Sequence, residues 1–442
     1  MTPAARAEAA IALLGEILAA PRAPADALAS AFFRARRFIG AADRRAVSEI
    51  VWQVLRSRRR LRWWLERDDR RSQSREEAKR ETARLLVGGS LLLSGTSLET
   101  LDQFFSGARF APAPLEGNER RALRHLVGQE LDHPEMPGAV RFEVPDWLLP
   151  RLEARFGTAL EAEMAALAKP APLDLRVNLL RGTREAARAA LAGEGIAAEV
   201  MNFSPWGLRV PGRSALVGGA AFQSGLVEIQ DEGSQLVALL VGAAPGMRVA
   251  DLCAGAGGKT LAMAMAMENR GHLVACDVSQ NRLDAAVRRL RRAGVHNAER
   301  HLLAPGDKWA KRQRGKFDAV LVDAPCTGTG TWRRHPDARA RLSPADLVEL
   351  LPRQSSILDM AAGLVRKGGR LVYATCSVLT EENEAQVSAF LARHPGFVAV
   401  PLAAAWPVES GPVPGDGPFL ALTPRKHGTD GFFAAVFERA EA

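Results

Sequence analysis

Apolar residues recur at helical spacing throughout the first third of the chain. Leu14, Ile17 and Leu18, for example, share one face of a first amphipathic helix. A proline-rich stretch at residues 133–138 interrupts this pattern and predicts a boundary. We therefore expect residues 1–145 to form an all-helical domain.

The pattern changes twice beyond that boundary. Residues 146–225 combine short helical and strand-like segments, which is typical of a small α+β module. Residues 226–442 alternate short apolar runs with helical stretches. The clearest runs are 248–252, 272–276, 317–322 and 370–374. Such alternation predicts a doubly wound, Rossmann-like α/β domain with a parallel sheet, whose ligands bind at the carboxyl ends of the strands.

Composition narrows the class of protein. The chain has 442 residues, enough for two or three domains, and its 47% hydrophobic and 25% charged residues are ordinary globular values. Its four cysteines form no Cys-x-x-Cys pair, so we expect no zinc site and no other metal. No apolar run is long enough to span a membrane, and Glu8 and Glu16 interrupt the first one, which argues against a secretory signal. We expect a cytoplasmic protein without membrane contact.

The positive charge is concentrated in one segment. The formal net charge is +9, and residues 34–84 hold 17 basic and 8 acidic residues, which accounts for the whole excess. Apolar residues at helical spacing within this segment predict folded helices with a basic outer face. With Trp63 and Trp64 beside the arginines, the segment predicts a surface that binds nucleic-acid phosphates. The alternative is a merely solvated face.

A glycine-rich loop follows the first strand of the expected parallel sheet. It reads DLCAGAGGKT from Asp251 to Thr260, and its small residues let a ligand approach the backbone. A phosphate-binding P-loop would need glycine where Cys253 stands, and a dinucleotide fingerprint would need it where Thr260 stands. S-adenosylmethionine needs only the small-residue turn. Asp277 ends the second strand and is suited to bind the ribose hydroxyls of either NAD or S-adenosylmethionine.

Two cysteines follow two further strands of the sheet. Cys326 comes after Asp323-Ala-Pro at the end of one strand, and Cys376 follows the next strand. Because parallel strands present their carboxyl ends at one edge, both thiols are expected beside the glycine loop. A reducing cytosol disfavours a disulfide, and two thiols without histidine make a poor metal site.

Methylation of a pyrimidine at C5 would use this set of groups. A thiolate adds to C6 and makes C5 nucleophilic, an acidic group stabilises the charge that develops near N3, and a further group assists product release. Cys376, Asp323 and Cys326 are residues of suitable type for these three tasks.

Three motifs identify a family that performs this chemistry. The sequences DLCAGAGGKT, DAPCTGTGTWRRHPD and YATCSVLTEENE closely resemble those of RNA 5-methylcytosine methyltransferases of the Sun/Nop class, above all the RsmB type that acts on small-subunit ribosomal RNA. The resemblance extends over essentially the whole chain. The segment FFRARRFIGAADRRAVSEIVWQVLR is similar to the helical domain related to the antitermination factor NusB.

The resemblance implies a role for each candidate site residue. Cys376 is implied to attack C6, Cys326 to help release the product, and Asp323 to contact both the target base and the cofactor. The implied cofactor is S-adenosylmethionine. Its expected binding residues are Cys253, Ala254, Gly255, Ala256, Gly257, Gly258, Lys259, Asp277, Arg282 and Asp323.

Two departures from the family pattern affect the cofactor site. Ala256 stands where proline is usual, a change that keeps the residue small. Many members carry an acid just after the third strand, whereas Asp307 lies a few residues later here, so we leave it out of the cofactor set. This absence would weaken adenine recognition rather than abolish methyl transfer.

The resemblance favours methylation of a cytosine in 16S ribosomal RNA. The sequence does not indicate an oligomeric state, and a monomer is our expectation. Related enzymes act on transfer RNA, and the motifs do not separate the two substrates. A non-catalytic RNA-binding or assembly protein of the same fold is a second alternative, which the retained thiols and Asp323 argue against. An NAD-dependent oxidoreductase is a third alternative, and it leaves the two strand-end cysteines without a role.

Overall fold

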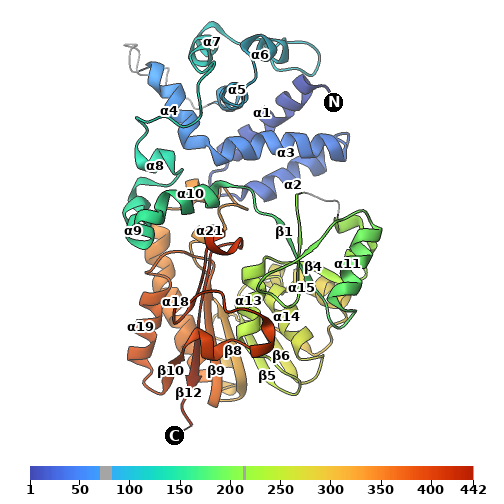
Figure 1. Cartoon of the computed structure of the whole chain (residues 1–442), viewed down its shortest axis with the longest axis vertical. Helices are drawn as coiled ribbons and strands as arrows, with labels where there is room; N and C mark the ends of the chain where they lie inside the picture. The colour runs from blue at the N-terminus through green and yellow to red at the C-terminus, as the bar shows by residue number, and fades with distance from the viewer. Residues whose placement is uncertain (70–81, 213–215, 442) are drawn as a thin grey trace. The chain divides into compact units, whose positions relative to one another are not determined.

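The computed structural model describes residues 1–69, 82–212 and 216–441, which fall into two compact units (Figure 1). The first unit comprises Met1–Ala168 and Arg334–Ser343, and the second comprises Lys169–Arg333 and Pro344–Ala442. No helix among these described residues is both long and apolar enough to cross a membrane.

The described part of the first unit contains helices and no strand, as the apolar spacing predicts. Two of its helices begin at threonines whose hydroxyls accept backbone amide hydrogen bonds, Thr2 before α1 and Thr82 before α5. Leu13 and Leu14 of α1 pack with Val51 of α3 in the core. The helices are α1 (Pro3–Ala19), α2 (Ala25–Ala35), α3 (Ala41–Arg56), α4 (Arg58–Asp69), α5 (Ala83–Leu93), α6 (Leu98–Phe104), α7 (Gly117–Arg124), α8 (Gly138–Arg141), α9 (Leu149–Phe156) and α10 (Leu160–Ala168).

A short segment from later in the chain completes this helical unit. It contains α17 (Ala338–Arg341) and follows the loop that carries Cys326. The Asp337 carboxylate accepts a hydrogen bond from the Ala25 amide at the start of α2, and the buried Arg339 donates one to the Leu167 carbonyl oxygen. The first unit therefore includes a segment that interrupts the second unit in sequence, between Arg333 and Pro344.

The second unit begins with a small antiparallel sheet. Its strand order is β2-β3-β1-β4, from β1 (Leu173–Val177), β2 (Glu199–Val200), β3 (Gly207–Val210) and β4 (Val227–Ile229). The helices α11 (Arg184–Gly193) and α12 (Ala220–Gln223) accompany it, and Leu175, Leu191 and Leu208 lie in their shared core. The predicted α+β character of this stretch is confirmed.

The larger sheet of the second unit is mixed, with a parallel central part. Its order is β10-β12-β9-β8-β5-β6-β7, and β11 pairs with β12. The strands are β5 (Arg248–Leu252), β6 (His272–Asp277), β7 (Ala298–Leu302), β8 (Phe317–Asp323), β9 (Val365–Thr375), β10 (Phe397–Val400), β11 (Leu420–Leu422) and β12 (Phe432–Arg439). Pairing is parallel from β9 to β7, whereas β12 runs antiparallel to β9, β10 and β11.

Helices cover both faces of this sheet, as Figure 1 shows. One face packs against α13 (Glu232–Leu240) and α14 (Gly258–Ala266), and the other packs against α18 (Pro344–Leu364) and α19 (Glu384–Arg393). α15 (Gln280–Ala293) connects β6 to β7. The strand order reverses between β5 and β8, so the predicted doubly wound fold is confirmed and its topological switch point lies at their carboxyl ends.

Candidate active site

The loop after β5 combines an unusual backbone with open space. Cys253, Gly255 and Gly257 have φ angles of +64°, +57° and +81°, values that glycine adopts at no steric cost and cysteine only with strain. A Cβ at Gly255 would meet no atom within 4 Å, whereas one at Gly257 would lie 3.2 Å from the Ala286 Cβ. The loop therefore packs against α15 at Gly257 and is open at Gly255.

Asp277 joins the end of β6 to this loop. It is buried, and its Oδ2 accepts a hydrogen bond from the Gly255 amide at 2.9 Å, while its Oδ1 accepts one from the Ser279 amide at 2.8 Å. Each carboxylate oxygen keeps a second lone pair that can accept from a hydroxyl. A fixed carboxylate beside an open small-residue turn fits the ribose of S-adenosylmethionine.

The helix α15 contacts the loop through a residue that the sequence analysis missed. The Arg289 guanidinium donates a hydrogen bond to the Ala256 carbonyl oxygen at 2.8 Å. Arg282, which the family resemblance implies, is exposed on the same helix, and its role stays a prediction. The two arginines are seven residues apart, which places them on one helix face, so helical spacing alone could have drawn attention to Arg289.

Lys259 and Asp323 form an ion pair beside the loop. The distance from Nζ to Oδ2 is 2.7 Å, and the lysine side chain is only 10% exposed. Burial alone would lower the pKa of Lys259, but the carboxylate of Asp323 outweighs it and the pKa is raised. Lys259 therefore carries its charge in contact with Asp323. The lysine ammonium also lies 5.4 Å from the centroid of the Phe432 ring.

The two strand-end thiols are in direct contact. The Sγ atoms of Cys326 and Cys376 are 3.4 Å apart, within hydrogen-bond distance for sulfur, and both cysteines are free. The hydrogen bond to Cys376 and the burial of the thiol raise the pKa of Cys326 well above its usual range. Cys326 therefore holds its proton at neutral pH. The prediction that both thiols lie together at the carboxyl edge is confirmed.

The other two cysteines are unsuited to nucleophilic chemistry. Burial raises the pKa of Cys253 to about 12, so its thiol, in the glycine-rich loop after β5, stays protonated. Cys276 is fully buried within β6, where burial also raises the pKa of its thiol.

Glu382 holds together the two loops that carry the thiols, and the sequence analysis gave it no role. It is fully buried, and its Oε1 accepts hydrogen bonds from the Thr327 amide at 2.9 Å and the Gln354 side chain at 3.0 Å. Its Oε2 accepts one from the Thr327 hydroxyl at 2.5 Å. Because Thr327 follows Cys326 directly and Glu382 lies in the segment after Cys376, these bonds fix one thiol relative to the other.

Two glycines bring the Cys326 loop against the segment before β12. The Gly330 amide donates to the Cys376 carbonyl oxygen at 3.0 Å, and the Gly431 amide donates to the Gly330 carbonyl oxygen at 2.8 Å. A Cβ at Gly330 would lie 2.1 Å from the Gly431 oxygen, which is far closer than such atoms can approach. Only glycine fits at position 330.

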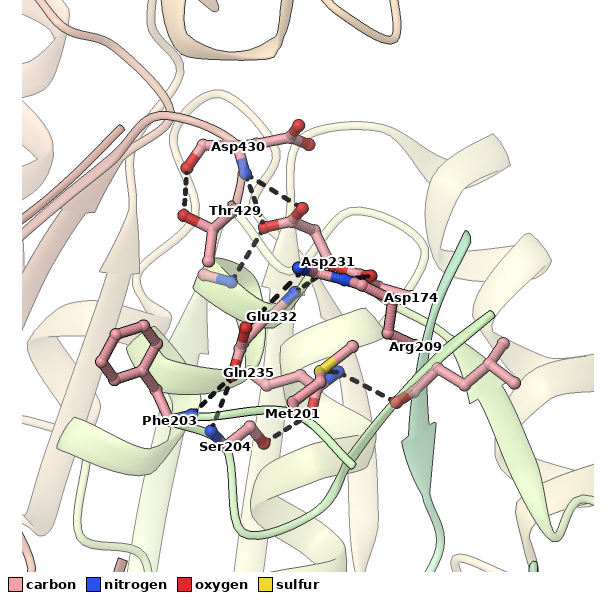
Figure 2. A network of polar contacts seen from close by, with 12 residues as sticks. Asp174, Met201, Phe203, Ser204, Arg209, Asp231, Glu232, Gln235, Thr429 and Asp430 are labelled. Atoms are coloured by element: carbon pink, nitrogen blue, oxygen red, sulfur yellow. Dashed lines mark hydrogen bonds and ion pairs between the residues drawn. The ribbon is translucent and has the colours of Figure 1, made fainter. Parts of the chain in front are cut away.

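A buried polar network anchors the end of the same loop. The Arg333 guanidinium pairs with the carboxylates of Asp430 and Asp231, and Asp231 accepts a hydrogen bond from the Asp430 amide. Figure 2 shows Asp430 bonded to Asp231 and, next to Asp231 in the chain, Glu232 beside Asp174 of the small sheet, which pairs with Arg209 of the same sheet. Asp174 also accepts a hydrogen bond from the Glu232 amide at the start of α13. The small sheet is thereby tied to the site.

Comparison with known proteins places the chain in a family. Residues 238–438 match the family model described as 16S rRNA methyltransferase RsmB/F, and residues 144–216 match the ferredoxin-like domain of RsmF/B-like methyltransferases. The chain is 34% identical over 316 residues to a probable ribosomal RNA small subunit methyltransferase B from Synechocystis sp. strain PCC 6803, which covers 70% of each chain. The chain belongs to the RsmB/F family of 16S rRNA methyltransferases. Ribosomal RNA small subunit methyltransferase B of Citrobacter koseri is 32% identical over 80% of this RsmB/F chain and 83% of its own.

Solved structures agree with this RsmB/F assignment. The crystal structure of PH0851 superposes with a TM-score of 0.79 at 25% identity, covering 99% of both chains. A methyltransferase homologue from Pyrococcus horikoshii gives a TM-score of 0.58 at 26% identity, covering 68% of this chain and 97% of its own. NSun6 from the same organism, solved with SFG, shares the fold with a TM-score of 0.60 at 22% identity.

Replacement of Glu382 by glutamine should loosen the Cys326 loop. The amide nitrogen of the introduced glutamine cannot accept a hydrogen bond, so at least one of the three donors that Glu382 binds on Thr327 and Gln354 loses this acceptor, at a cost of about 1–3 kcal/mol. We expect the E382Q variant to melt at a lower temperature in calorimetry and to transfer methyl groups more slowly. Glu349→Gln, at an exposed position on α18, is the control and should change neither value. Normal activity and stability in E382Q would contradict the assigned role.

The stability of the protein should depend on pH through Asp251. This side chain at the end of β5 is fully buried, and burial raises its pKa from 3.8 to about 7. The folded state therefore binds a proton that the unfolded state releases between about pH 4 and 7, and stability falls over this range as the pH rises. Asp251→Asn removes this dependence.

Urea unfolding at a series of pH values tests this expectation. The stability of Asp251→Asn relative to the wild type should increase from about pH 4 to about pH 7, by up to ~1.4 kcal/mol per pH unit, and then level off. Asp416→Asn, at an exposed position, is the control. A stability difference that does not change with pH would show that Asp251 is ionised in the folded protein.

Proposed function

We propose that this chain transfers a methyl group from S-adenosylmethionine to C5 of a cytosine in RNA, with 16S ribosomal RNA as the substrate. The observation that carries the proposal is the contact between Cys326 and Cys376 beside the Lys259–Asp323 ion pair. A pair of thiols at two adjacent strand ends matches the two sulfur-dependent steps of this reaction, adduct formation and adduct release. The names of the curated relatives support the RNA substrate.

The residues around the β5 loop would hold the cofactor. The open turn at Gly255 and the fixed carboxylate of Asp277 suit its ribose, and the resemblance adds Cys253, Ala254, Ala256, Gly257, Gly258, Lys259 and Arg282 to the contact set. When bound, S-adenosylmethionine supplies the electrophilic methyl group. The residues of the chain bind it, orient it and present the base to it.

The raised pKa of Cys326 supports a different role for each of the two thiols. Cys326 retains its proton, which leaves Cys376 as the nucleophile for C6 of the cytosine. Asp323 contacts the base, and its charged partner Lys259 offsets the negative charge that develops on the ring. Formation of the adduct turns the Cys376 sulfur into a thioether and removes the main cause of the high pKa of Cys326. Cys326 then releases its proton to solvent more readily and, as a thiolate, accepts the proton of C5. The C5–C6 double bond re-forms and Cys376 leaves.

The domain organisation remains part of the proposal. We assign residues 1–145 to a NusB-like RNA-binding domain, residues 146–225 to the small module and residues 226–442 to the methyltransferase domain. The helical character of the first stretch and the start of the ferredoxin-like match at residue 144 support this division, whereas the compact helical unit extends to Ala168. A monomeric chain acting in the cytoplasm completes the proposal.

Substitution of the two thiols should produce different defects. Cys376→Ala is expected to abolish methyl transfer because no thiolate remains to activate C5. Cys326→Ala should form the covalent adduct but release it slowly, so that RNA-linked protein accumulates on a denaturing gel. Cys276→Ala, which removes a thiol buried in the core beneath the sheet, should do neither. Methylation by Cys376→Ala at the wild-type rate would rule out the proposed nucleophile.

The substrate is tested by offering three RNAs to the same enzyme. Bare 16S ribosomal RNA, isolated small ribosomal subunits and bulk transfer RNA are each incubated with protein and S-adenosylmethionine, and 5-methylcytosine is then mapped. We expect methylation of ribosomal RNA. Methylation confined to transfer RNA would overturn the substrate assignment while leaving the chemistry intact.

A further inference from the structure

The loop between α2 and α3 displays an aromatic ring to solvent. Phe38 is 80% exposed, more than any other aromatic side chain in the described part of the chain, whereas the nearby Phe32 and Ile39 are buried. Arginines 34, 36, 37, 44 and 45 surround this ring in the sequence, with Asp43 as the one acidic residue between them. Asp43 itself pairs with the N-terminal amine and Arg6.

Most of the described arginines in the basic segment 34–84 have structural partners. Arg60, for example, pairs with Asp132 and the buried Glu143, and Arg59 pairs with Asp146. Arg36 pairs with Glu16 and lies 3.7 Å from the centroid of the Phe32 ring. Further ion pairs involve Arg62, Arg67 and Arg84. The excess of positive charge therefore overstates the number of arginines available to an RNA.

Three arginines of this segment, unlike the other described ones, lack such partners among the residues that the structure describes. Arg34, Arg37 and Arg45 are exposed, and none of them makes an ion pair or hydrogen bond with any residue that the structure describes. Arg34 is in the last turn of α2, Arg37 precedes Phe38, and Arg45 lies four residues into α3, about 6 Å along the helix axis. The side chain of Arg44 helps to fix the loop by donating to the Ile39 carbonyl oxygen at 2.7 Å. Along the chain, the three unpaired arginines thus lie on either side of the exposed ring, from the last turn of α2 to the first turns of α3.

We propose that Phe38 and these three arginines form a docking site for a single-stranded segment of the RNA substrate. An unpaired base stacks on the Phe38 ring, and the guanidinium groups contact neighbouring phosphates. Stacking requires a base that is free of its duplex, because only such a base exposes its face to a side chain. This inference rests on the proposed function for the identity of the polymer, and it locates the contact on residues that no catalytic step uses.

A second exposed aromatic residue of the same unit has a ring face that is already in contact with a cation. Phe110 is 70% exposed, but the Arg109 guanidinium lies over its ring, 4.9 Å from the centroid. No cation of the described chain lies over the Phe38 ring in this way. The face of Phe38 is thus available to a base, while the cations beside it are available to phosphates.

The test measures binding and catalysis separately in the full-length protein. The probes are a single-stranded RNA oligonucleotide and the same strand annealed to its complement, followed by bare 16S ribosomal RNA. Phe38→Ala should weaken binding of the single strand by at least about fivefold and leave the salt dependence unchanged, since stacking involves no counterion release. Phe38→Tyr keeps an aromatic ring and should restore binding. Binding of the duplex should be unaffected by either change.

Unlike Phe38→Ala, substitution of the arginines should change the salt dependence of RNA binding. Arg37→Ala/Arg45→Ala should weaken binding of the single strand and reduce the slope of log K against log salt by about 1.4, or about 0.7 for each phosphate that is no longer neutralised. Arg121→Ala/Arg124→Ala is the matched control, with the same reduction of charge from two exposed arginines on α7 of the same unit. It should leave the slope within error of the wild type.

The outcomes distinguish this proposal from the proposed function. Equal losses of affinity in the two double variants, or undiminished binding in Phe38→Ala, would overturn the docking site, whatever the activity of Cys376→Ala. If the variants bind bare RNA normally but fail to bind small ribosomal subunits, the proposal is also overturned, because the loop would then contact a protein. At saturating RNA the Phe38→Ala enzyme should methylate at the wild-type rate, since the site positions no reacting group.

Discussion

Parallel pairing of β8 with β9 is the constraint on which the active site depends. Asp323, the last residue of β8, lies opposite Ala374, so both strands end at nearly the same level of the sheet. Cys326 and Cys376 follow within a few residues and meet at 3.4 Å. The adjacent switch between β5 and β8 brings the glycine loop to the same edge. These two strand pairings bring the two thiols, the Asp323 carboxylate and the glycine-rich loop to one edge of the sheet.

The loops beyond these strands need further restraint, because backbone pairing ends at Asp323 and Thr375. Glu382 supplies part of it through buried hydrogen bonds to Thr327, and the close approach of Gly330 to Gly431 supplies another part. Arg333 continues the connection to the polar network that reaches the small sheet. Burial of so many charged groups costs free energy unless each is paired, and here the pairing also fixes the geometry of the reacting groups.

The sequence predicts much of this arrangement. Alternating apolar runs indicate the doubly wound sheet, and the positions of Cys326, Cys376, Asp323 and Asp277 after those runs place them at one edge. Local patterns do not show which side chains meet, so the Lys259–Asp323 pair and the contact of Arg289 with Ala256 emerge only from the fold. Glu382 lies within one of the family motifs, but only tertiary structure reveals its contact with Thr327. The net charge of residues 34–84 likewise cannot separate arginines in ion pairs from those that are free.

The proposed roles of the two thiols depend on the protonation of Cys326, which alkylation as a function of pH measures. Protein is treated briefly with iodoacetamide over a series of pH values from acidic to alkaline, and modification of each cysteine is quantified by mass spectrometry. We expect the midpoint for Cys326 to lie above the usual range of a cysteine thiol and to shift to lower pH in Cys376→Ala, where the sulfur–sulfur hydrogen bond is absent. A midpoint for Cys326 within the usual thiol range, or one unaffected by Cys376→Ala, would show that the contact does not hold the proton on Cys326.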